Sequence, residues 1–308
     1  MGFVSLTEGD DGHKSLVLKG GFNSKVDEAL RDLSWDRLVL FGVEWEDYQP
    51  LVKHSDKIKW LAVPLGPDSS VGLNELKSVE KLEMGDSLSP PVDFRGWSSL
   101  RDLKILMGSC YPLEFVACPD LYELDIEGFP DLDLKSLKGA QSLEKLRVSK
   151  GRLKSLCGLD KLSGLEELRL FNLRSLLDIS DLTVSYRIKK LELEGISKLE
   201  DVSPVFEVES LEECSLDVKN ASLESSSVFK KLPNLVKIQS DVIVSFLNWR
   251  DFCSSSLRSL VVKFDNATVS DQMEIRTIFE EEGMNVIACE IFSSKTYMCC
   301  IEFDAKEY

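Results

Sequence analysis

A short apolar pattern recurs through most of this chain of 308 residues. The clearest copies read Leu121-x-x-Leu124-x-Ile126, Leu143-x-x-Leu146-x-Val148, Leu165-x-x-Leu168-x-Leu170 and Ile188-x-x-Leu191-x-Leu193. Twelve copies follow one another at intervals of 21 to 24 residues, starting at His13, Trp35, Ile58, Val79, Leu100, Leu121, Leu143, Leu165, Ile188, Leu211, Leu235 and Leu257. Only His13 and Ser240 depart from an apolar residue at the three template positions of these copies. Internal repeats of this length predict a stack of similar units.

The spacing of the apolar residues predicts one strand in each copy. In an L-x-x-L-x-L segment the first, fourth and sixth side chains point inward, and the rest of the repeat returns the chain to the next parallel strand. A single repeat cannot bury its apolar edge alone, so the stack must be contiguous and covered at both ends. We therefore expect an α/β fold with a parallel sheet of about 12 strands.

The repeat resembles the leucine-rich repeat family over residues 13 to 264. Apolar residues at every third position from Leu153 to Leu165 favour 3₁₀ turns in the return segments. With Gly158-Leu159 and Gly164-Leu165, they are similar to the short SDS-twenty-two-like and bacterial subclass. The resemblance implies a horseshoe-shaped solenoid. The ninth position, often Asn in the wider family, holds Val43, Gly66, Ser87, Gly108, Phe129, Gly151, Leu173 and Ile196. We expect no asparagine ladder, and a register set mostly by apolar packing.

Different patterns at the two ends predict caps on one continuous domain: residues 1–34, then the solenoid at 35–264, then residues 265–308. The N-terminal cap should hold a strand near Leu16-Val17-Leu18 and a helix capped by Asn23 or Ser24, with Val26, Ala29, Leu30 and Leu33 on its apolar face. The C-terminal cap should hold a helix from Ser270-Asp271 to Gly283, with Ile275, Ile278 and Phe279 inward, and two strands at 286–292 and 297–303 joined by Ser293-Ser294.

Composition and charge exclude several classes of partner. The chain carries 37 Lys and Arg against 53 Asp and Glu, a formal charge of −16. This acidity argues against nucleic acid as a partner, because a protein binds the phosphate backbone through clustered basic residues. The opening residues do not form a signal peptide, and no apolar run reaches the roughly 18 residues of a membrane span. The eight cysteines show no C-x-x-C spacing, as expected of buried thiols in a reducing compartment. We expect a cytoplasmic protein that is monomeric when free.

Candidates for catalysis are scarce. The two histidines, His13 and His54, lack a nearby motif partner, and residues 19–25 do not match a phosphate-binding loop. Paired carboxylates such as Glu166-Glu167 occupy consecutive outward strand positions, where carboxylates are more often solvated than catalytic. We expect no enzymatic activity, no metal and no cofactor. An enzyme acting through Cys299-Cys300 or a histidine is the alternative from a different class.

The outward strand positions are the better candidates for function. The second, third, fifth and seventh residues of the twelve copies include 16 acidic and 15 basic residues, a net of 15 − 16 = −1. The remaining net charge of −15 lies elsewhere on the chain. Aromatic rings and arginines flanked by charge are favoured at interface centres. With Phe41 as a further aromatic anchor, the predicted partner-binding residues are Trp60, Tyr122, Asp125, Glu127, Arg147, Arg169, Phe171, Glu192, Glu194, Asp217 and Asp241.

These features predict a non-enzymatic protein-binding module whose partner has a basic surface. A freestanding acidic repeat chain resembles bacterial immunity proteins, and this resemblance implies an inhibitor that neutralises a toxin or enzyme. Charge complementarity would speed capture of a toxin with a basic substrate site. The alternatives are a regulatory or targeting subunit of a phosphatase or another enzyme, suggested by the repeat subclass, and a fragment of a leucine-rich repeat receptor.

Overall fold

The computed structural model describes residues 2–85, 92–106, 118–254, 256–264, 272–293 and 297–304. The chain divides into two compact units. Unit 1 comprises Met1–Asp131 and Lys135–Val148, and unit 2 comprises Leu132–Leu134 and Ser149–Tyr308. Both are built from the same element, a short strand of a mostly parallel sheet followed by a return segment with little helix. This is the fold of a leucine-rich repeat solenoid.

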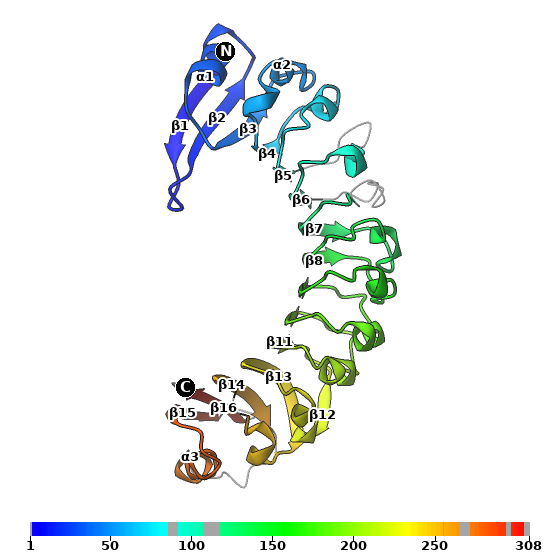
Figure 1. Ribbon diagram of the computed structural model, residues 1–308, viewed down its shortest axis with the longest axis vertical. Coiled ribbons are helices and arrows are strands. Elements are labelled where there is room, and N and C mark those ends of the chain that lie inside the picture. Colours follow the sequence, from blue (N-terminus) through cyan, green and yellow to red (C-terminus); the bar gives the residue numbers. More distant parts are fainter. Residues whose placement is uncertain are drawn as a thin grey trace. The chain divides into compact units, whose positions relative to one another are not determined.

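In unit 1, parallel strands follow one another in sequence order, so each repeat pairs with the next (Figure 1). They are β2 (Lys14–Gly20), β3 (Arg37–Val43), β4 (Trp60–Leu65), β5 (Lys81–Met84), β6 (Asp102–Leu106) and β7 (Glu123–Phe129), with β8 (Lys145–Gly151) beginning in this unit. The return segments hold α2 (Gln49–Val52) and the 3₁₀ helices η1 (Ser55–Lys57), η2 (Leu73–Glu75), η3 (Phe94–Gly96) and η5 (Lys135–Leu137).

In unit 2, the parallel order is β9 (Glu167–Phe171), β10 (Lys190–Glu194), β11 (Glu213–Asp217), β13 (Lys237–Phe246) and β14 (Ser259–Phe264). One short strand that the repeat pattern does not predict, β12 (Ser222–Ser225), pairs in parallel with the second half of β13. The return segments hold the 3₁₀ helices η6 (Leu159–Lys161), η7 (Ser180–Val184), η8 (Ser203–Glu207), η9 (Ser226–Lys231) and η10 (Trp249–Phe252).

The core of each unit consists of the inward positions of the repeats. Each of the twelve copies forms a strand that begins one or two residues after the copy's first residue. Leu124 in β7 and Leu168 in β9 are both fully buried, as the repeat pattern predicts. Ser240, the polar exception, is also fully buried, and its hydroxyl oxygen accepts a hydrogen bond from the Val242 N–H at 3.2 Å. The local bond satisfies a group that would otherwise be costly to bury.

Ninth-position residues also contribute to the core where they are apolar. Val43, Phe129, Leu173 and Ile196 are buried, whereas Ser87 and Gly108 lie outside the described residues. Burial of these side chains is consistent with a register held by apolar packing rather than by a ladder of amides.

The first 34 residues contain one strand more than the sequence predicts. β1 (Phe3–Glu8) pairs antiparallel with β2 to form a hairpin. The repeat pattern misses it because it lies before the first copy, and its side chains stay partly or fully exposed. The expected helix is α1 (Ser24–Asp32), and the Asn23 side chain accepts from the Val26 N–H at 3.0 Å. Leu33 is 39% exposed, contrary to its predicted place on the apolar face, because the helix has already ended there.

After β14 the chain forms a helix and an antiparallel hairpin. In α3 (Gln272–Glu281), Ile275 and Phe279 are fully buried, and Ile278 is half-buried. β16 (Tyr297–Phe303) pairs antiparallel with β14, and β15 (Val286–Ser293) pairs antiparallel with β16. The predicted helix start at Ser270-Asp271 and the turn residue Ser294 lie outside the described residues.

The cysteines differ in burial. Cys118, Cys214 and Cys299 are buried, Cys157, Cys253, Cys289 and Cys300 are half-buried, and Cys110 lies outside the described residues. All seven described thiols are free. In the same parts of the chain, no helix has both the length and the apolar character needed to span a membrane.

Candidate binding surface

Alternation along each strand produces an outward face, which we define as the second, third, fifth and seventh residues of every repeat. β7 shows the principle. Leu124 and Ile126 are fully buried, whereas Glu123, Asp125 and Glu127 between and after them are half-buried. Side chains of neighbouring strands stand side by side on this face because the parallel register pairs equivalent positions. Residues at the same position of successive repeats therefore form a column across the sheet, and we number each column by its position in the repeat.

One group of contacts on the outward face of unit 1 surrounds Trp60, the first residue of β4. Arg37 lies over the indole ring at 4.7 Å from its centroid, and Lys81 lies over it at 4.5 Å. The indole N–H of Trp60 donates to a Glu83 carboxylate oxygen at 2.8 Å, and Arg37 pairs with the other oxygen at 2.9 Å. The His13 ring packs edge-on at 5.5 Å. Neighbouring side chains therefore already contact both the ring and the indole N–H of Trp60, which the sequence predicted to bind the partner.

The other predicted residues of unit 1 lie on β7 or directly before it, and on β8. Asp125, whose side chain is only 18% exposed, lies between two cations: Lys104 at 3.6 Å and Arg147 at 3.9 Å. The Lys145 ammonium lies 5.3 Å from the centre of the Tyr122 ring. Glu127 is half-buried at the seventh position of the same repeat. The structure thus brings Asp125 and Arg147 together in one ion-pair group and places Tyr122 in a separate contact with Lys145.

In unit 2 the outward face includes a ladder of alternating charges. The third column runs Glu167, Lys190, Glu213 and Lys237 across β9 to β13. Lys190 pairs with Glu213 at 2.8 Å, and in the second column Lys189 pairs with Glu166 at 2.8 Å. Arg169 bridges Glu167 at 2.5 Å and Glu192 at 3.7 Å. Hydrogen bonding from Lys189 lowers the pKa of Glu166, and bonding to Glu213 raises the pKa of Lys190.

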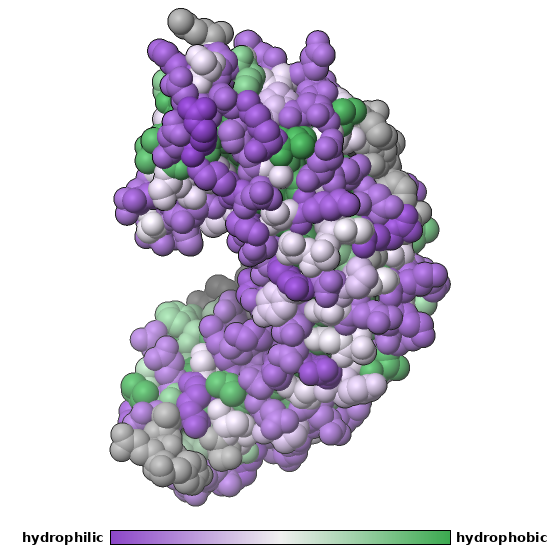
Figure 2. Space-filling model, turned by 45° about the horizontal axis from the view of Figure 1, so that its top comes forward, coloured by the Kyte–Doolittle hydropathy of each residue, from purple (hydrophilic) through white to green (hydrophobic). Residues whose placement is uncertain are grey.

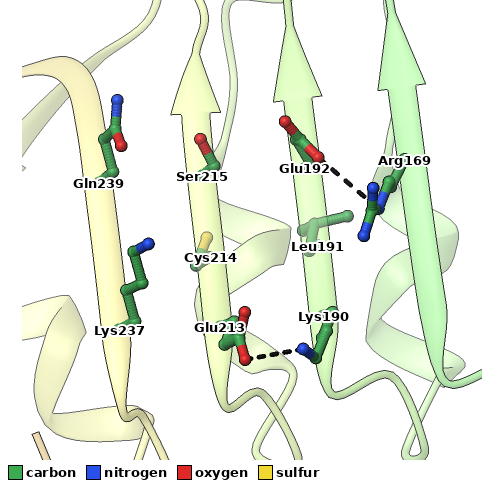
Figure 3. Close-up of a pocket in the computed structure, with 9 residues that line it drawn as sticks. All are labelled: Arg169, Lys190, Leu191, Glu192, Glu213, Cys214, Ser215, Lys237 and Gln239. Carbon is green, nitrogen blue, oxygen red and sulfur yellow. Dashed lines mark ion pairs between the residues drawn. The ribbon is translucent and has the colours of Figure 1, made fainter. Parts of the chain in front are cut away.

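A shallow depression of about 210 Å³ lies within this ladder. Figure 3 shows Arg169 reaching toward Glu192 and Lys190 toward Glu213, with Ser215, Lys237 and Gln239 on the following strands. Cys214 also lines the depression, but burial raises the pKa of its thiol to about 12. The thiol therefore stays protonated at neutral pH, and this protonation makes it a poor nucleophile. The charged and polar side chains that line the depression can form polar contacts with a ligand.

The seventh column of unit 2 is its most acidic strip. The register places Glu194 beside Phe171 on one side and beside Asp217 on the other. Asp241, at the same position of the next repeat, is paired with Lys263 at 2.6 Å. Glu194 and Asp217 make no ion pair with the described residues. Like charges facing each other on adjacent strands are unfavourable in the free protein, so an incoming cation would relieve them.

Of the remaining catalytic candidates, His54 is engaged in local contacts and Cys299 is buried. His54 is half-buried, and its Nε2 lies 2.8 Å from an Asp27 carboxylate oxygen that also pairs with Lys53 at 2.6 Å. Burial raises the pKa of the Cys299 thiol well above its ordinary range. Among the described residues, no three His, Cys, Asp or Glu side chains come close enough to hold a metal ion.

Several residues that shape this surface were not predicted. Around Trp60 they are Arg37, Lys81 and Glu83, and in the depression they are Lys190, Glu213, Ser215, Lys237 and Gln239. A usable signal was present, because third-column charges alternate in sign from repeat to repeat in unit 2. Comparing equivalent positions of successive repeats would have found the ladder.

No protein-family profile matches the chain, and no curated protein matches it in sequence. Among solved structures, it is similar to a leucine-rich repeat protein of Leptospira interrogans, with a TM-score of 0.54 and 16% identity. That match covers 70% of this chain and 57% of the other, so the chain spans little more than half of that relative.

Two further solved structures are similar to a lesser degree. An internalin (inlF) of Listeria monocytogenes gives a TM-score of 0.49 at 16% identity, covering 82% of this chain and 87% of the other. A plant peptide hormone receptor, RGFR1, gives 0.47 at 14% identity, covering 82% and 55%. At such identities a structural likeness is one of fold, and on that ground the Leptospira protein supports a leucine-rich repeat fold for this chain.

Proposed function

We propose that this protein is a non-enzymatic protein-binding module that contacts its partner through the outward face. The observation that carries the proposal is that the inward and outward positions of each repeat hold different classes of residue. Buried leucines hold the strands, while aromatic rings and charged side chains occupy the outward columns of both units. Rings and arginines surrounded by polar groups are the residues that contribute most at protein interfaces.

Charge supports a partner with a basic surface. The whole chain has a formal charge of −16, and the outward columns are nearly balanced. Figure 2 shows hydrophilic residues over most of the face in view. Long-range attraction by the acidic remainder would speed the encounter with a basic protein. An inhibitor that blocks a toxin or another enzyme with a basic substrate site is the more specific form of this proposal.

The test is affinity capture from the native host at low salt, comparing two variants of equal charge change. Glu194→Lys/Asp217→Lys alters the acidic strip of unit 2, whereas Glu200→Lys/Glu224→Lys alters two exposed carboxylates away from the outward columns. We expect the first variant to lose a basic partner that the second still captures. Equal capture by both, or no salt-sensitive partner, would contradict the proposal. An activity assay of the captured protein then separates an inhibitor from a regulator.

A further inference from the structure

A second surface in unit 1 has the chemistry of a receptor for a cationic side chain. Its lining residues come from the segments that follow β2 and β3, from α2 and from the residue that follows α2. We call it the acidic pocket, with a volume of about 720 Å³. Its lining residues are Phe22, Glu44, Trp45, Glu46, Asp47, Gln49, Pro50, Val52 and Lys53. None of the predicted site residues belongs to it.

The floor of the acidic pocket is apolar and aromatic. The Phe22 and Trp45 rings meet edge to face with their centres 5.5 Å apart. Trp45 is only 9% exposed, so its ring is firmly held, and Pro50 and Val52 are half-buried beside it. A rigid wall of this kind can cover the aliphatic stem of an arginine or lysine while the charged head remains at the rim.

The rim carries an excess of negative charge. Glu44, Glu46 and Asp47 contribute −3 and Lys53 contributes +1, a net of −2. Asp47 is partly engaged, because it accepts from the Gln49 backbone N–H at 2.9 Å. Glu44 and Glu46 are exposed and form no ion pair within the described chain. Two carboxylates above an apolar floor are therefore available to a ligand.

A cation already lies against one wall of the acidic pocket. The Lys53 ammonium lies 5.5 Å from the centre of the Phe22 ring while it pairs with Asp27 at 2.6 Å. This contact is the cation–π arrangement that aromatic rings favour. Because Asp27 holds Lys53, the lysine does not neutralise Glu44 and Glu46. The pocket tolerates a positive charge and retains carboxylates to bind a second one.

We propose that the acidic pocket receives an arginine or lysine side chain of the protein partner, flanked by apolar residues. The inference rests on the proposed function and adds a second contact away from the outward face. An anionic ligand would be repelled by the rim, and an uncharged apolar ligand would cover the carboxylates without pairing them. A basic side chain satisfies both the rim and the floor.

The experiment uses the full chain and the capped tripeptide acetyl-Leu-Arg-Leu-amide, with acetyl-Leu-citrulline-Leu-amide as its uncharged isostere. The reporter is the Trp45 indole N–H signal in a ¹H–¹⁵N spectrum, assigned as the signal lost in Trp45→Phe. This N–H is buried without an acceptor among the described residues, so its signal should respond to changes around the ring. We expect the arginine peptide to shift the signal at millimolar concentrations.

Two double variants of equal charge change separate pocket binding from general charge. Glu44→Gln/Glu46→Gln should weaken the arginine peptide about fivefold, as should the citrulline replacement, whereas Glu200→Gln/Glu224→Gln should leave binding unchanged. Equal binding of both peptides, equal binding to both variants, or no shift of the Trp45 signal would overturn the inference. Because the peptide titration does not involve the outward face, such a failure leaves the capture test of the proposed function independent.

Discussion

The outward faces of the two units use the same strand geometry for different chemistry. In unit 1, Trp60 is enclosed by Arg37 from β3 and by Lys81 and Glu83 from β5, the two strands that flank its own. In unit 2, pairs such as Lys190 and Glu213 join neighbouring strands and leave a depression between them. The repeat therefore determines where a side chain lies. It does not determine whether neighbouring side chains already contact that side chain in the free protein.

This difference separates stabilising residues from contact residues. The charged groups around Trp60 contact its ring and one another, although the Arg37 Nε is buried without a hydrogen-bond partner among the described residues. Part of their interaction energy is therefore realised in the free protein. Glu194 and Asp217 in unit 2 instead face each other without a cation from the described residues. We expect substitutions around Trp60 to lower the free energy of unfolding, and substitutions in the acidic strip of unit 2 to act mainly on affinity.

The largest effect should come from the buried leucines, and it should be similar in the two units. Leu168→Ala in β9 and Leu103→Ala in β6 each remove a fully buried or nearly fully buried side chain. Each should lower the free energy of unfolding by about 2–5 kcal/mol, measured by urea denaturation. If outward substitutions cost as much as these, the assigned strand register is wrong.

The next effect tests the claim that Trp60 stabilises unit 1. Trp60→Ala removes the ring contacts with Arg37 and Lys81 and the hydrogen bond to Glu83, and should cost about 1–3 kcal/mol of unfolding free energy. Trp60→Phe keeps a ring but loses the hydrogen bond, so it should cost about 1 kcal/mol. A neutral Trp60→Ala with a large loss of partner affinity would reassign this residue to the contact surface.

A smaller effect should appear in affinity rather than stability. Tyr122→Ala and Phe171→Ala remove half-buried rings from the outward faces of unit 1 and unit 2, respectively. Together they should weaken partner binding by about three- to tenfold, measured by isothermal titration with the captured partner. The single variants show which unit contributes more to the contact. Unchanged affinity in both would mean that the partner binds elsewhere.

The repeat fold could be predicted because its determinants are local and periodic. Leu124 and Leu168 occupy the same place in two copies, and burial at that place is independent of the outward residues. β1 and β12 escaped prediction because they lie outside the strand positions of the repeat pattern, and their pairing depends on partners that no periodicity identifies.

The candidate sites were predictable only in part. The aromatic and charged outward residues could be placed on a face, but whether Trp60 is free or enclosed depends on side-chain directions across three strands. The acidic pocket could not be predicted, since Phe22 and Trp45 belong to successive repeats and meet only after β2 and β3 pair. Contacts between repeats, rather than patterns within one, determine these sites.

The smallest predicted effect sharpens the comparison through one ion pair in each unit. Lys190 and Glu213 are both nearly half exposed, so a double-mutant cycle with Lys190→Ala and Glu213→Ala should give a coupling of about 0.2–1 kcal/mol that falls with added salt. Because the folded pKa of Lys190 is raised, its contribution is complete below the unfolded lysine pKa and is lost as pH rises through the folded value. The same cycle on the less exposed pair Arg37 and Glu83 should give the larger coupling, since burial reduces solvent screening. Equal couplings at neutral pH would mean that burial beside Trp60 does not strengthen the Arg37–Glu83 pair relative to the more exposed Lys190–Glu213 pair.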